Sequence, residues 1–503
     1  MKKRILSVLL IFTIVLTALS TFACGEKTPP ADSTTPQSVT TEPIPEETAP
    51  TVDDWGRDII EDSVDPDLKF EGETVNLLCR SEATYVDEFA TFDEDNSTLL
   101  NKAVFERNET VSDRLGIDLN IVTMPGAYGD PNTAFLGEVR GQAMSGTSEY
   151  DIVALYASQG CMLVTEKLFY DLYELPHLDL EKPWWTQTYV DEISYDGQLY
   201  SVIGDVTITA ISRVGVTFFN KDLAEERLAK GTDVYKIVKD GKWTLDTLLT
   251  LSRDIYEDVN ANDKRDPGDI FGYSIRIDSM PMDLWSGALD VPITTKNAEG
   301  IPELTFFSDR TITAFDKLNA LIYGNPGAIY GLDLNTTIST FTAGEVLFLT
   351  QGLLRAEKFT DMTDDYGILP MPKLDEEQDG YYTAPQNAHS IMVVLNNCYN
   401  AEATGATLEL LGAESYRKVR PAYFEMTMKG RYMNGEEDAE MFDLIVENIN
   451  YNFGALYSTK ALGAVCALFR DVQTPIASRY QAKERGLKSS LKKLLEDLAN
   501  DDK

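Results

Sequence analysis

Residues 74–155 alternate between strand-like and helix-like patterns, and this alternation limits the possible folds more than any other feature. Residues 74–79 form a short apolar run, residues 99–115 carry apolar side chains at helical spacing, and residues 117–122 alternate apolar with polar. A second helix is expected over residues 133–144, and residues 150–155 form an almost wholly apolar strand. Such a strand is typical of the centre of a parallel sheet, which is buried on both faces. The order strand, helix, strand, helix, strand therefore predicts an α/β fold.

The remainder of the chain continues this mixture, and no internal repeat is evident. Gly116 is placed to end the first helix, and Thr244 is placed to cap a later one. From residue 401 onward the pattern is mainly helical. A chain of 503 residues is long enough for two or three domains with their own cores. Further strands are expected at residues 213–219, 346–349, 366–372 and 390–395.

The composition excludes some partners. The formal net charge is -38, with 82 acidic against 44 basic residues, whereas phosphate backbones and anionic membranes need a basic surface. We therefore expect no nucleic-acid partner, and the acidity mildly disfavours strongly anionic ligands. Most of this charge is explained by solubility alone.

Cysteine and histidine usage argues against several chemistries. No Cys-x-x-Cys pair occurs, which disfavours zinc ribbons and redox motifs. Cys79 and Cys161 lie at or near strand-like runs, so a disulfide is conceivable, although buried free thiols are the simpler expectation. His177 and His389 are the only histidines, and neither has metal-ligand spacing, so we expect both to be structural.

The N-terminus carries an export signal. A basic start, an apolar run over residues 5–19 and small residues before Cys24 make a secretory signal. This segment resembles a bacterial lipoprotein signal, which implies that residues 1–23 are removed and that Cys24 is diacylated. An ordinary signal peptide or an anchor helix are the alternatives, but the run is short for a membrane span. Residues 24–66 are rich in Thr, Pro and acidic residues and predict a disordered linker. The rest of the chain is then expected outside the cytoplasmic membrane, tethered to its outer face.

Several later segments, in their order, resemble the extracellular solute-binding proteins of ABC importers, of the type II, maltodextrin-binder-like class. Residues 421–454 resemble the C-terminal region of a Firmicute lipoprotein branch of that class. The other segments that carry the resemblance are YDIVALYASQG (150–160), VTFFNKDLAEE (216–226), GKWTLDTLLTLSRDI (241–255), AGEVLFLTQGLLRAEKF (343–359) and YGILPMPK (366–373).

The resemblance implies two α/β lobes joined by two or three crossing strands, with a helical C-terminal region. The first lobe would comprise residues 71–213 and 374–415, and the second residues 214–373 and 416–503. A small solute, a mono- or oligosaccharide, would bind between the lobes and be delivered to membrane permease subunits. This implies a monomeric binding protein that is not an enzyme and needs no catalytic cofactor.

The resemblance also implies candidate ligand contacts at the loops that face the cleft. Sugars are recognised by flat apolar faces together with planar amides and carboxylates, and several of these side chains have that chemistry. Leu353 stands where relatives carry Trp, which argues against a maltodextrin-like ligand. Trp184 and Trp185 either line the cleft or brace the surface of the first lobe. The candidate contacts are Ser81, Glu82, Tyr156, Ser158, Gln159, Asp205, Thr207, Thr209, Trp285, Gln351, Gln386 and Asn387.

Residues 258–269 are similar to a calcium loop. Oxygen-bearing side chains fall at positions one, three, five, nine and twelve of an EF-hand-like pattern, and Lys264 would lend its carbonyl. Asp263 replaces the turn glycine, and a shorter carboxylate replaces the final Glu. An acidic surface turn is the alternative to a structural Ca²⁺ site. The candidate ligands are Asp258, Asn260, Asn262, Lys264, Asp266 and Asp269.

Two other functions remain open at this level. An extracellular glycoside hydrolase needs only two carboxylates, but no signature locates such a pair, and the eight-fold repetition of a barrel is absent. A binding protein that reports solute occupancy to a membrane kinase would have the same sequence features as an importer subunit.

Overall fold

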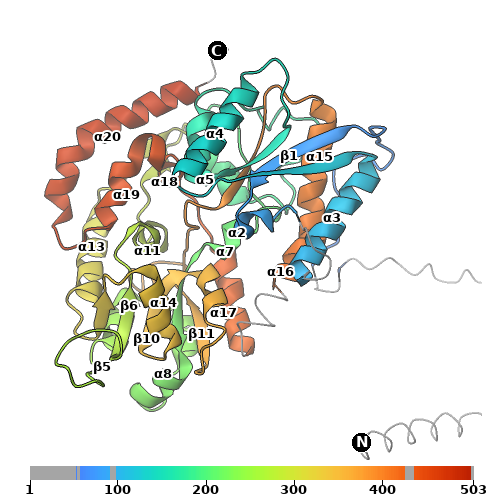
Figure 1. The fold of residues 1–503 in the computed structure, drawn as a ribbon. Helices are drawn as coiled ribbons and strands as arrows, with labels where there is room; N and C mark the ends of the chain where they lie inside the picture. Colours follow the sequence, from blue (N-terminus) through green and yellow to red (C-terminus); the bar gives the residue numbers. More distant parts are fainter. Residues whose placement is uncertain (1–51, 54–56, 91–97, 425–434, 500–503) are drawn as a thin grey trace, which may run out of the picture. The chain divides into compact units, whose positions relative to one another are not determined.

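In the computed structural model, residues 52–53, 57–90, 98–424 and 435–499 are described. Every element below belongs to the compact unit formed by residues 60–503. Its strands form two main sheets. Each sheet, with the helices packed around it, occupies its own half of the unit (Figure 1).

The first sheet has the strand order β12-β3-β1-β2 and follows the predicted series. Strand β1 pairs in parallel with β2 and β3, while β12 arrives from a later part of the chain and runs antiparallel to β3. Strand β3 lies inside the sheet and is buried along most of its length, as its apolar sequence predicts. The strands are β1 (Thr74–Arg80), β2 (Asp118–Met124), β3 (Ile152–Tyr156) and β12 (Ser390–Val394).

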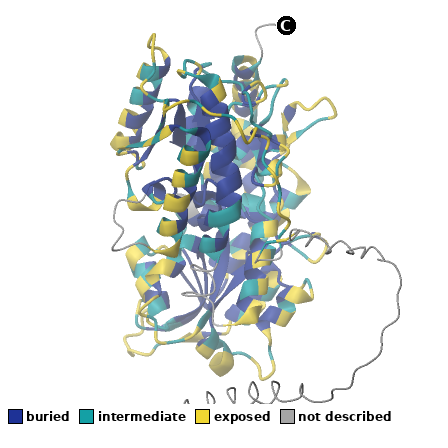
Figure 2. Cartoon of the chain, turned by 90° about the vertical axis from the view of Figure 1, so that its right-hand side faces the viewer, coloured by how far each residue is buried: buried dark blue, intermediate teal, exposed yellow. Residues whose placement is uncertain are grey.

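The helices around the first sheet begin and end where local signals place them. Thr98 caps α3 through its side chain, and Gly116 closes that helix in the left-handed conformation with φ 65°. Helix α15 is buried along nearly its whole length (Figure 2). The helices are α2 (Ala83–Val86), α3 (Leu99–Leu115), α4 (Asp130–Ala143), α5 (Ala157–Val164), α6 (Gln187–Ile193), α7 (Thr209–Ser212) and α15 (Ala401–Glu414).

The second sheet has the order β11-β4-β10-β6-β5, with β9 also paired to β6. Strands β6 and β10 run parallel, whereas β4 is antiparallel to both β10 and β11. Strands β4 and β10 are buried at every position, which explains their continuous apolar and aromatic sequences. The strands are β4 (Gly215–Asn220), β5 (Tyr256–Glu257), β6 (Ile270–Ile275), β9 (Ala328–Tyr330), β10 (Val346–Gly352) and β11 (Tyr366–Pro370).

Helices cover the second sheet, and a small hairpin extends beyond it. Thr244 caps α10 by accepting a hydrogen bond from the backbone of Thr247, as predicted. The helices are α8 (Lys221–Arg227), α9 (Val234–Lys239), α10 (Leu245–Ser252), α11 (Ser279–Asp283), α12 (Trp285–Ala288), α13 (Asp309–Ile322), α14 (Leu334–Thr342) and the 3-10 helix η1 (Leu353–Lys358). The hairpin is β7 (Thr294–Lys296) with β8 (Pro302–Leu304).

The C-terminal region is helical, as predicted, and contacts both halves. The π-helix η2 (Ser415–Val419) and α16 (Arg420–Tyr423) pack along α3, so residues 415–423 lie with the first sheet. Helix α17 packs on β11 of the second sheet. The remaining elements are α17 (Glu436–Glu447), α18 (Phe453–Leu456), η4 (Ser458–Leu462), α19 (Gly463–Phe469) and α20 (Ile476–Leu498).

Three segments connect the two halves at one place. Residues 213–214 pair with residues 385–386, because the backbone N–H of Gln386 donates to the carbonyl of Arg213 at 3.0 Å. A third segment joins them, since Asn450 donates its backbone N–H to Thr383 at 2.8 Å. These contacts confirm the predicted two lobes with crossing strands between them.

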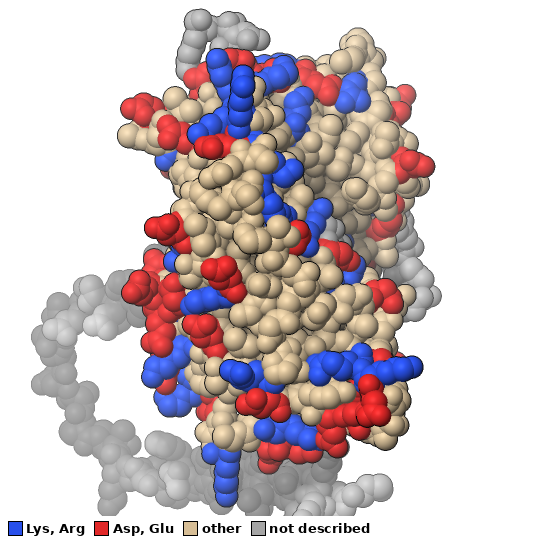
Figure 3. All heavy atoms as spheres, turned by 90° about the vertical axis from the view of Figure 1, so that its left-hand side faces the viewer, with Lys and Arg blue, Asp and Glu red and all other residues tan. Residues whose placement is uncertain are grey.

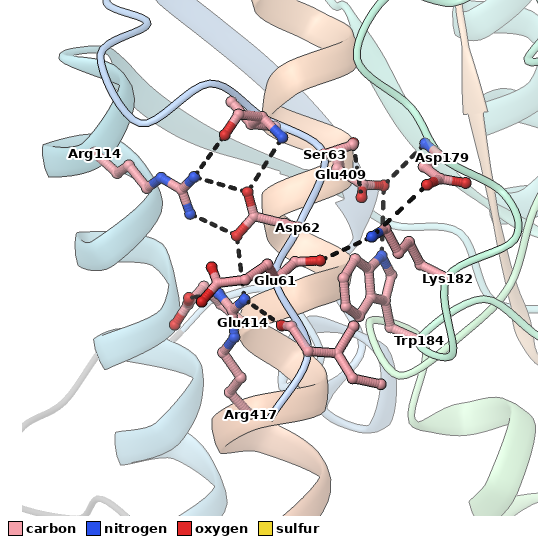
Figure 4. A network of polar contacts seen from close by, with 12 residues as sticks. Glu61, Asp62, Ser63, Arg114, Asp179, Lys182, Trp184, Glu409, Glu414 and Arg417 are labelled. Carbon is pink, nitrogen blue, oxygen red and sulfur yellow. Dashed lines mark hydrogen bonds and ion pairs between the residues drawn. The ribbon is translucent and has the colours of Figure 1, made fainter. Parts of the chain in front are cut away.

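The segment just before the first sheet is held by a buried carboxylate. The side chain of Asp62 is 1% exposed and lies between Arg114 of α3, at 2.6 Å, and Arg417 of η2, at 3.2 Å (Figure 4). Burial raises the pKa of Asp62, but the hydrogen bonds and charges of both arginines outweigh it and hold that pKa below its ordinary value. Residues 60–66 therefore belong to the folded unit and not to the predicted linker.

Two tryptophans brace the first lobe. Trp184 and Trp185 are 1% and 2% exposed, and both indole N–H groups point at one carboxylate oxygen of Glu409, at 3.4 and 3.1 Å. Gly412 allows this packing, because a methyl group at its Cα would lie 2.6 Å from the ring of Trp184. Of the two predictions for these residues, the bracing role is confirmed, and Figure 4 shows Trp184 beside Glu409.

We predict that Asp62→Asn lowers the free energy of unfolding by about 2–3 kcal/mol at pH 7, because it leaves two arginines without their shared carboxylate. Urea unfolding measures the loss. Asp316→Asn, which changes an exposed carboxylate on α13, is the matched control and should have no effect. Because the pKa of Asp62 is lowered, its contribution is present above pH 3.8 and is lost as the pH falls further. A variant as stable as the wild type at pH 7 would contradict this role.

Candidate functional site

Five charged or aromatic side chains stand where strands of both sheets end. Arg80 and Tyr156 are the last residues of β1 and β3, and Arg276 and Arg355 follow β6 and β10. Arg213 lies in the crossing segment between α7 and β4. In open α/β sheets, ligands bind outside the carboxyl ends of the strands, so this is where a site is expected. Helices α2 and α7 lie between the two sheets in Figure 1.

Tyr85 of α2 is the centre of this group. The guanidinium carbon of Arg80 lies 3.3 Å from the centroid of the Tyr85 ring, and that of Arg213 lies 4.8 Å from it. Arg80 also lies 5.3 Å from the centroid of Tyr156. An aromatic face attracts cations, so one ring helps to hold two like charges close together.

The second lobe adds Arg355 to the same group. Leu353 at the start of η1 donates its backbone N–H to Val214 at 2.9 Å, which brings η1 next to the crossing segment. Burial lowers the pKa of Arg355, and the charges of Arg213 and Arg276 lower it further. Guanidinium groups from both lobes and from the crossing segment therefore share one electrostatic environment.

A buried carboxylate supports the group from the first lobe. One oxygen of Glu88 accepts from both the backbone N–H and the hydroxyl of Thr209, each at 2.7 Å, and the other accepts from Ser390. Arg80 donates to the Ser390 hydroxyl at 2.9 Å and to the carbonyl of Ala388 at 3.2 Å. Burial raises the pKa of Glu88, and these hydrogen bonds oppose the shift. The network fixes the end of β1 against α7 and β12.

Several buried polar atoms around this group have no hydrogen-bond partner within the described chain. They include Nε of Arg213 and of Arg355, and the side-chain nitrogens Nε2 of Gln351 and His389. Both polar atoms of the Gln386 amide are also without a partner. Buried polar groups are almost always paired in native proteins, so this concentration indicates a place built to bind something.

The cavity at the crossing segments is small. It is lined by residues 384–385, Asn387, His389 and residues 450–452, with residues 286–287 and 290–292 of the second lobe opposite, and its volume is about 60 Å³. A water molecule in the liquid occupies roughly 30 Å³, so this space holds waters but not a sugar ring.

Of the predicted contacts in the first lobe, Tyr156 lies beside Arg80 of the arginine group, whereas the carboxylate of Glu82 is already hydrogen-bonded to the backbone of a neighbouring loop. The carboxylate of Glu82 accepts from the backbone N–H groups of Gly126, at 3.0 Å, and Ala127, at 2.9 Å. It thus ties the loop after β1 to the loop after β2. The side chain of Ser81 is exposed beside it.

The other first-lobe candidates mostly face the interior. Ser158 is buried and Gln159 is half-buried at the start of α5. Thr207 and Thr209 are 0% and 1% exposed, and their hydroxyls are bonded to Gly204 and Glu88 respectively. Asp205 is also buried and accepts a long hydrogen bond, 3.5 Å, from Arg420.

The remaining candidates lie at the crossing segments and in the second lobe. Gln386 packs against the end of β10, since a methyl group on Gly352 would lie 2.8 Å from its amide nitrogen, and Gln351 is the residue before that glycine. Asn387 lines the small cavity and reaches α18 and η4 through hydrogen bonds of 3.5 Å. Trp285 is fully buried. Tyr156 and Gln386 thus lie with the arginines, and ligand contact by the whole predicted set stays a prediction.

Sequence reasoning missed Arg80, Tyr85, Arg213, Arg276 and Arg355. The sequence carried a usable signal, because Arg80 ends one buried strand and Arg276 directly follows another. Sugar recognition favours amides, carboxylates and aromatic rings, so that chemistry alone does not point to basic residues.

The loop over residues 258–269 has part of the predicted calcium geometry. Ala261 and Asp263 adopt φ of 56° and 58°, so Asp263 does take the left-handed position of the turn glycine. Asp258 accepts from the backbone of Asp263 at 2.9 Å, and Asp269 is fully buried with one oxygen unpartnered. No group of three or more His, Cys, Asp or Glu in the described residues is arranged to hold a metal ion.

The cysteines and histidines have structural settings. Cys79, Cys161 and Cys466 are buried free thiols, and Cys398 is a half-buried free thiol. This agrees with the expectation of free thiols and not with a disulfide between Cys79 and Cys161. His177 contacts Glu402 at 2.7 Å. His389 is fully buried, and burial together with the charges of Arg80 and Arg213 lowers its pKa to about 4.

Within the described residues, no helix has the length and apolar character needed to cross a membrane.

Comparison with known proteins identifies the fold. No protein-family model matches the sequence, and no curated protein is similar to it by sequence. Solved structures of solute-binding proteins are similar in three dimensions. A cyclo/maltodextrin-binding protein complexed with maltotetraose has a TM-score of 0.53 at 11% identity, covering 86% of this chain and 97% of that chain.

Two bacterial proteins give the same result. RafE from Streptococcus pneumoniae, in its apo form, has a TM-score of 0.52 at 12% identity over 85% of this chain and 99% of its own. The GacH receptor of Streptomyces glaucescens has a TM-score of 0.52 at 16% identity, with the same two coverages, 85% and 99%. The predicted two-lobed, type II periplasmic-binding-protein-like α/β fold is therefore confirmed.

We predict that His389 makes the protein less stable in weak acid. Because its folded pKa, about 4, lies below the ordinary 6.5, its contribution is complete above pH 6.5 and is lost as the pH falls to about 4. The expected loss is about 3 kcal/mol. Chemical denaturation from pH 7 to pH 4 should show a smaller loss for His389→Gln than for the wild type. His177→Gln, which changes the other histidine, should keep the wild-type pH dependence, and identical profiles for all three proteins would contradict the prediction.

Proposed function

We propose that this protein is the extracellular substrate-binding component of an ABC importer. It captures a small solute, a mono- or oligosaccharide, between its lobes and releases it unchanged to membrane permease subunits, without catalysis. The observation that carries the proposal is the set of partnerless polar atoms that meet between the lobes, contributed by the ends of β1 and β10 and by the crossing segments. Such atoms gain their hydrogen bonds when a polar solute is enclosed.

The crossing segments support a hinge mechanism. They connect the lobes beside the cavity, whose present volume of about 60 Å³ is too small for a sugar. A solute that contacts both lobes would stabilise the closed form, because the open form lacks half of those contacts. We place residues 60–213 and 374–423 in the first lobe, since Asp62 binds Arg114 of α3 and residues 415–423 pack on α3, and residues 214–373 and 435–499 in the second.

The saccharide class is supported by the proteins of similar fold. One was solved with maltotetraose and another with acarbose. Tyr156 is half-buried and offers a ring of the kind that sugars stack on, and Gln351 and Gln386 offer planar amides.

We predict that the purified protein binds a saccharide stoichiometrically and leaves it intact. In a thermal-shift screen against a sugar panel, a ligand at one hundred times its Kd should stabilise the fold by about 2.7 kcal/mol. X-ray scattering should show a smaller radius of gyration with that ligand, and chromatography should recover it unhydrolysed. Stabilisation only by amino acids, peptides or polyamines, or release of a hydrolysis product, would contradict the proposal.

The export signal and lipid anchor complete the proposed setting. The residues concerned, including Cys24, lie outside the described residues. We propose that residues 1–23 are removed, that Cys24 carries the lipid, and that the following segment spaces the lobes from the outer face of the membrane. Mass spectrometry of the protein from its host should show a lipidated N-terminus at Cys24, and a mature chain that begins elsewhere would refute it.

We also propose a structural Ca²⁺ in the loop over residues 258–269. The left-handed Asp263 and the buried, partnerless oxygen of Asp269 support it. Asp258, Asn260, Asn262, Asp266 and Asp269 would supply side-chain oxygens, and Lys264 its carbonyl. The ion would hold together the loop that leads into β6.

We predict that Ca²⁺ raises the melting temperature with an apparent Kd on the order of 10⁻⁴–10⁻³ M, as in extracellular calcium modules. Asp258→Asn should abolish this response. Asp254→Asn, which changes a carboxylate that is 90% exposed just before the loop, should preserve it. A calcium response that survives Asp258→Asn, or none in the wild type, would assign the loop to an acidic surface turn.

A further inference from the structure

Two of the arginines between the lobes lack the acidic partners that arginines usually have. The chain contains 82 acidic residues, yet Arg213 and Arg355 form no ion pair with any residue that the structure describes. Arg213 is 7% exposed, and its guanidinium carbon lies 4.8 Å from the centroid of the Tyr85 ring. Removing a cation from water without a counter-charge is costly, so this arrangement is stable only if something else compensates it.

Two nearby carboxylates already have partners. Glu88 is held by Thr209 and Ser390, and Asp278 pairs with Arg276. Glu357 is the carboxylate nearest in effect to Arg355: its charge raises the pKa of Arg355, opposing burial and the other arginines, but it forms no ion pair with Arg355. Within the described residues, Arg213 and Arg355 are thus without a carboxylate at ion-pairing distance.

We propose that the solute is an acidic saccharide whose anionic group binds between Arg213 and Arg355 when the lobes close. This rests on the proposed function and specifies its substrate class. A guanidinium presents parallel N–H donors that match a carboxylate, which makes such pairs stronger than neutral hydrogen bonds. Because one arginine belongs to the crossing segment and the other to the second lobe, a bound anion would also pull the lobes together.

Neighbouring residues suit the rest of such a sugar. Tyr156 is half-buried and Tyr128 is 78% exposed, with their ring centroids 6.5 Å apart, so an aromatic surface leads from the arginines outward. Gln351 and Gln386 supply amide groups for hydroxyls.

The overall acidity of the chain does not oppose this proposal. On the face shown in Figure 3, acidic and basic side chains are interspersed around uncharged areas. Surface charges are screened beyond about 8 Å at physiological ionic strength, so the buried Arg213 and the half-buried Arg355 dominate inside the cleft. The sequence-based expectation that acidity disfavours strongly anionic ligands considered net charge alone.

Isothermal titration calorimetry of the purified protein tests the proposal with three probes: trigalacturonate, which carries carboxylates, a sulfated disaccharide, and neutral maltotriose. We expect binding of an acidic probe with an affinity that falls as salt is raised. Arg213→Gln and Arg355→Gln should each weaken it about 10- to 100-fold, as expected for a charge-assisted hydrogen bond. Arg485→Gln, an exposed arginine on α20, is the control and should bind like the wild type.

The outcomes separate this proposal from the function on which it rests. Binding of maltotriose but of neither acidic probe would overturn the acidic class and leave the saccharide-binding function intact. Acidic binding that both arginine variants retain would overturn the assigned position. Binding of no saccharide would contradict both. Unchanged urea unfolding of the variants would show that any loss of affinity is local.

Discussion

The unpaired cation of Arg213 in the crossing segment is the constraint on which the site depends. Its backbone is fixed on both sides, since its N–H donates to Thr209 at 3.2 Å and its carbonyl accepts from Gln386 at 3.0 Å. Its guanidinium rests on Tyr85, with no carboxylate within ion-pairing distance in the described chain. The backbone of Arg213 is thus held in place, its buried Nε has no hydrogen-bond partner in the described chain, and an anionic group enclosed in the cleft would supply the missing counter-charge.

The Glu88 network explains why that group would be recognised and not merely attracted. It joins α2, α7 and β12 through Thr209 and Ser390, and it orients Arg80 against Tyr85. Glu88 offsets the charge of Arg80, which leaves Arg213 and Arg355 as the groups available to a solute. Preorganised donors of this kind lower the entropy lost on binding.

The sequence predicted the elements better than the site. Apolar runs such as residues 150–155 and a cap such as Gly116 act locally, so β3 and the end of α3 could be predicted. The site depends on tertiary contacts that local patterns do not contain. Thr209 was expected to face solute but is bonded to Glu88, and Glu82 binds backbone amides of a neighbouring loop. Likewise, the linker was predicted to extend to residue 66 because nothing in its composition indicates that Asp62 meets Arg114 and Arg417.

Hydrogen–deuterium exchange with and without a saccharide identified as a ligand tests the central claim most directly. Enclosure between the lobes predicts slower exchange at the end of β1 and in α2, in the crossing segments around Arg213 and Gln386, and in η1 of the second lobe. Protection confined to one lobe, or found away from these segments, would contradict capture of the solute in the cleft.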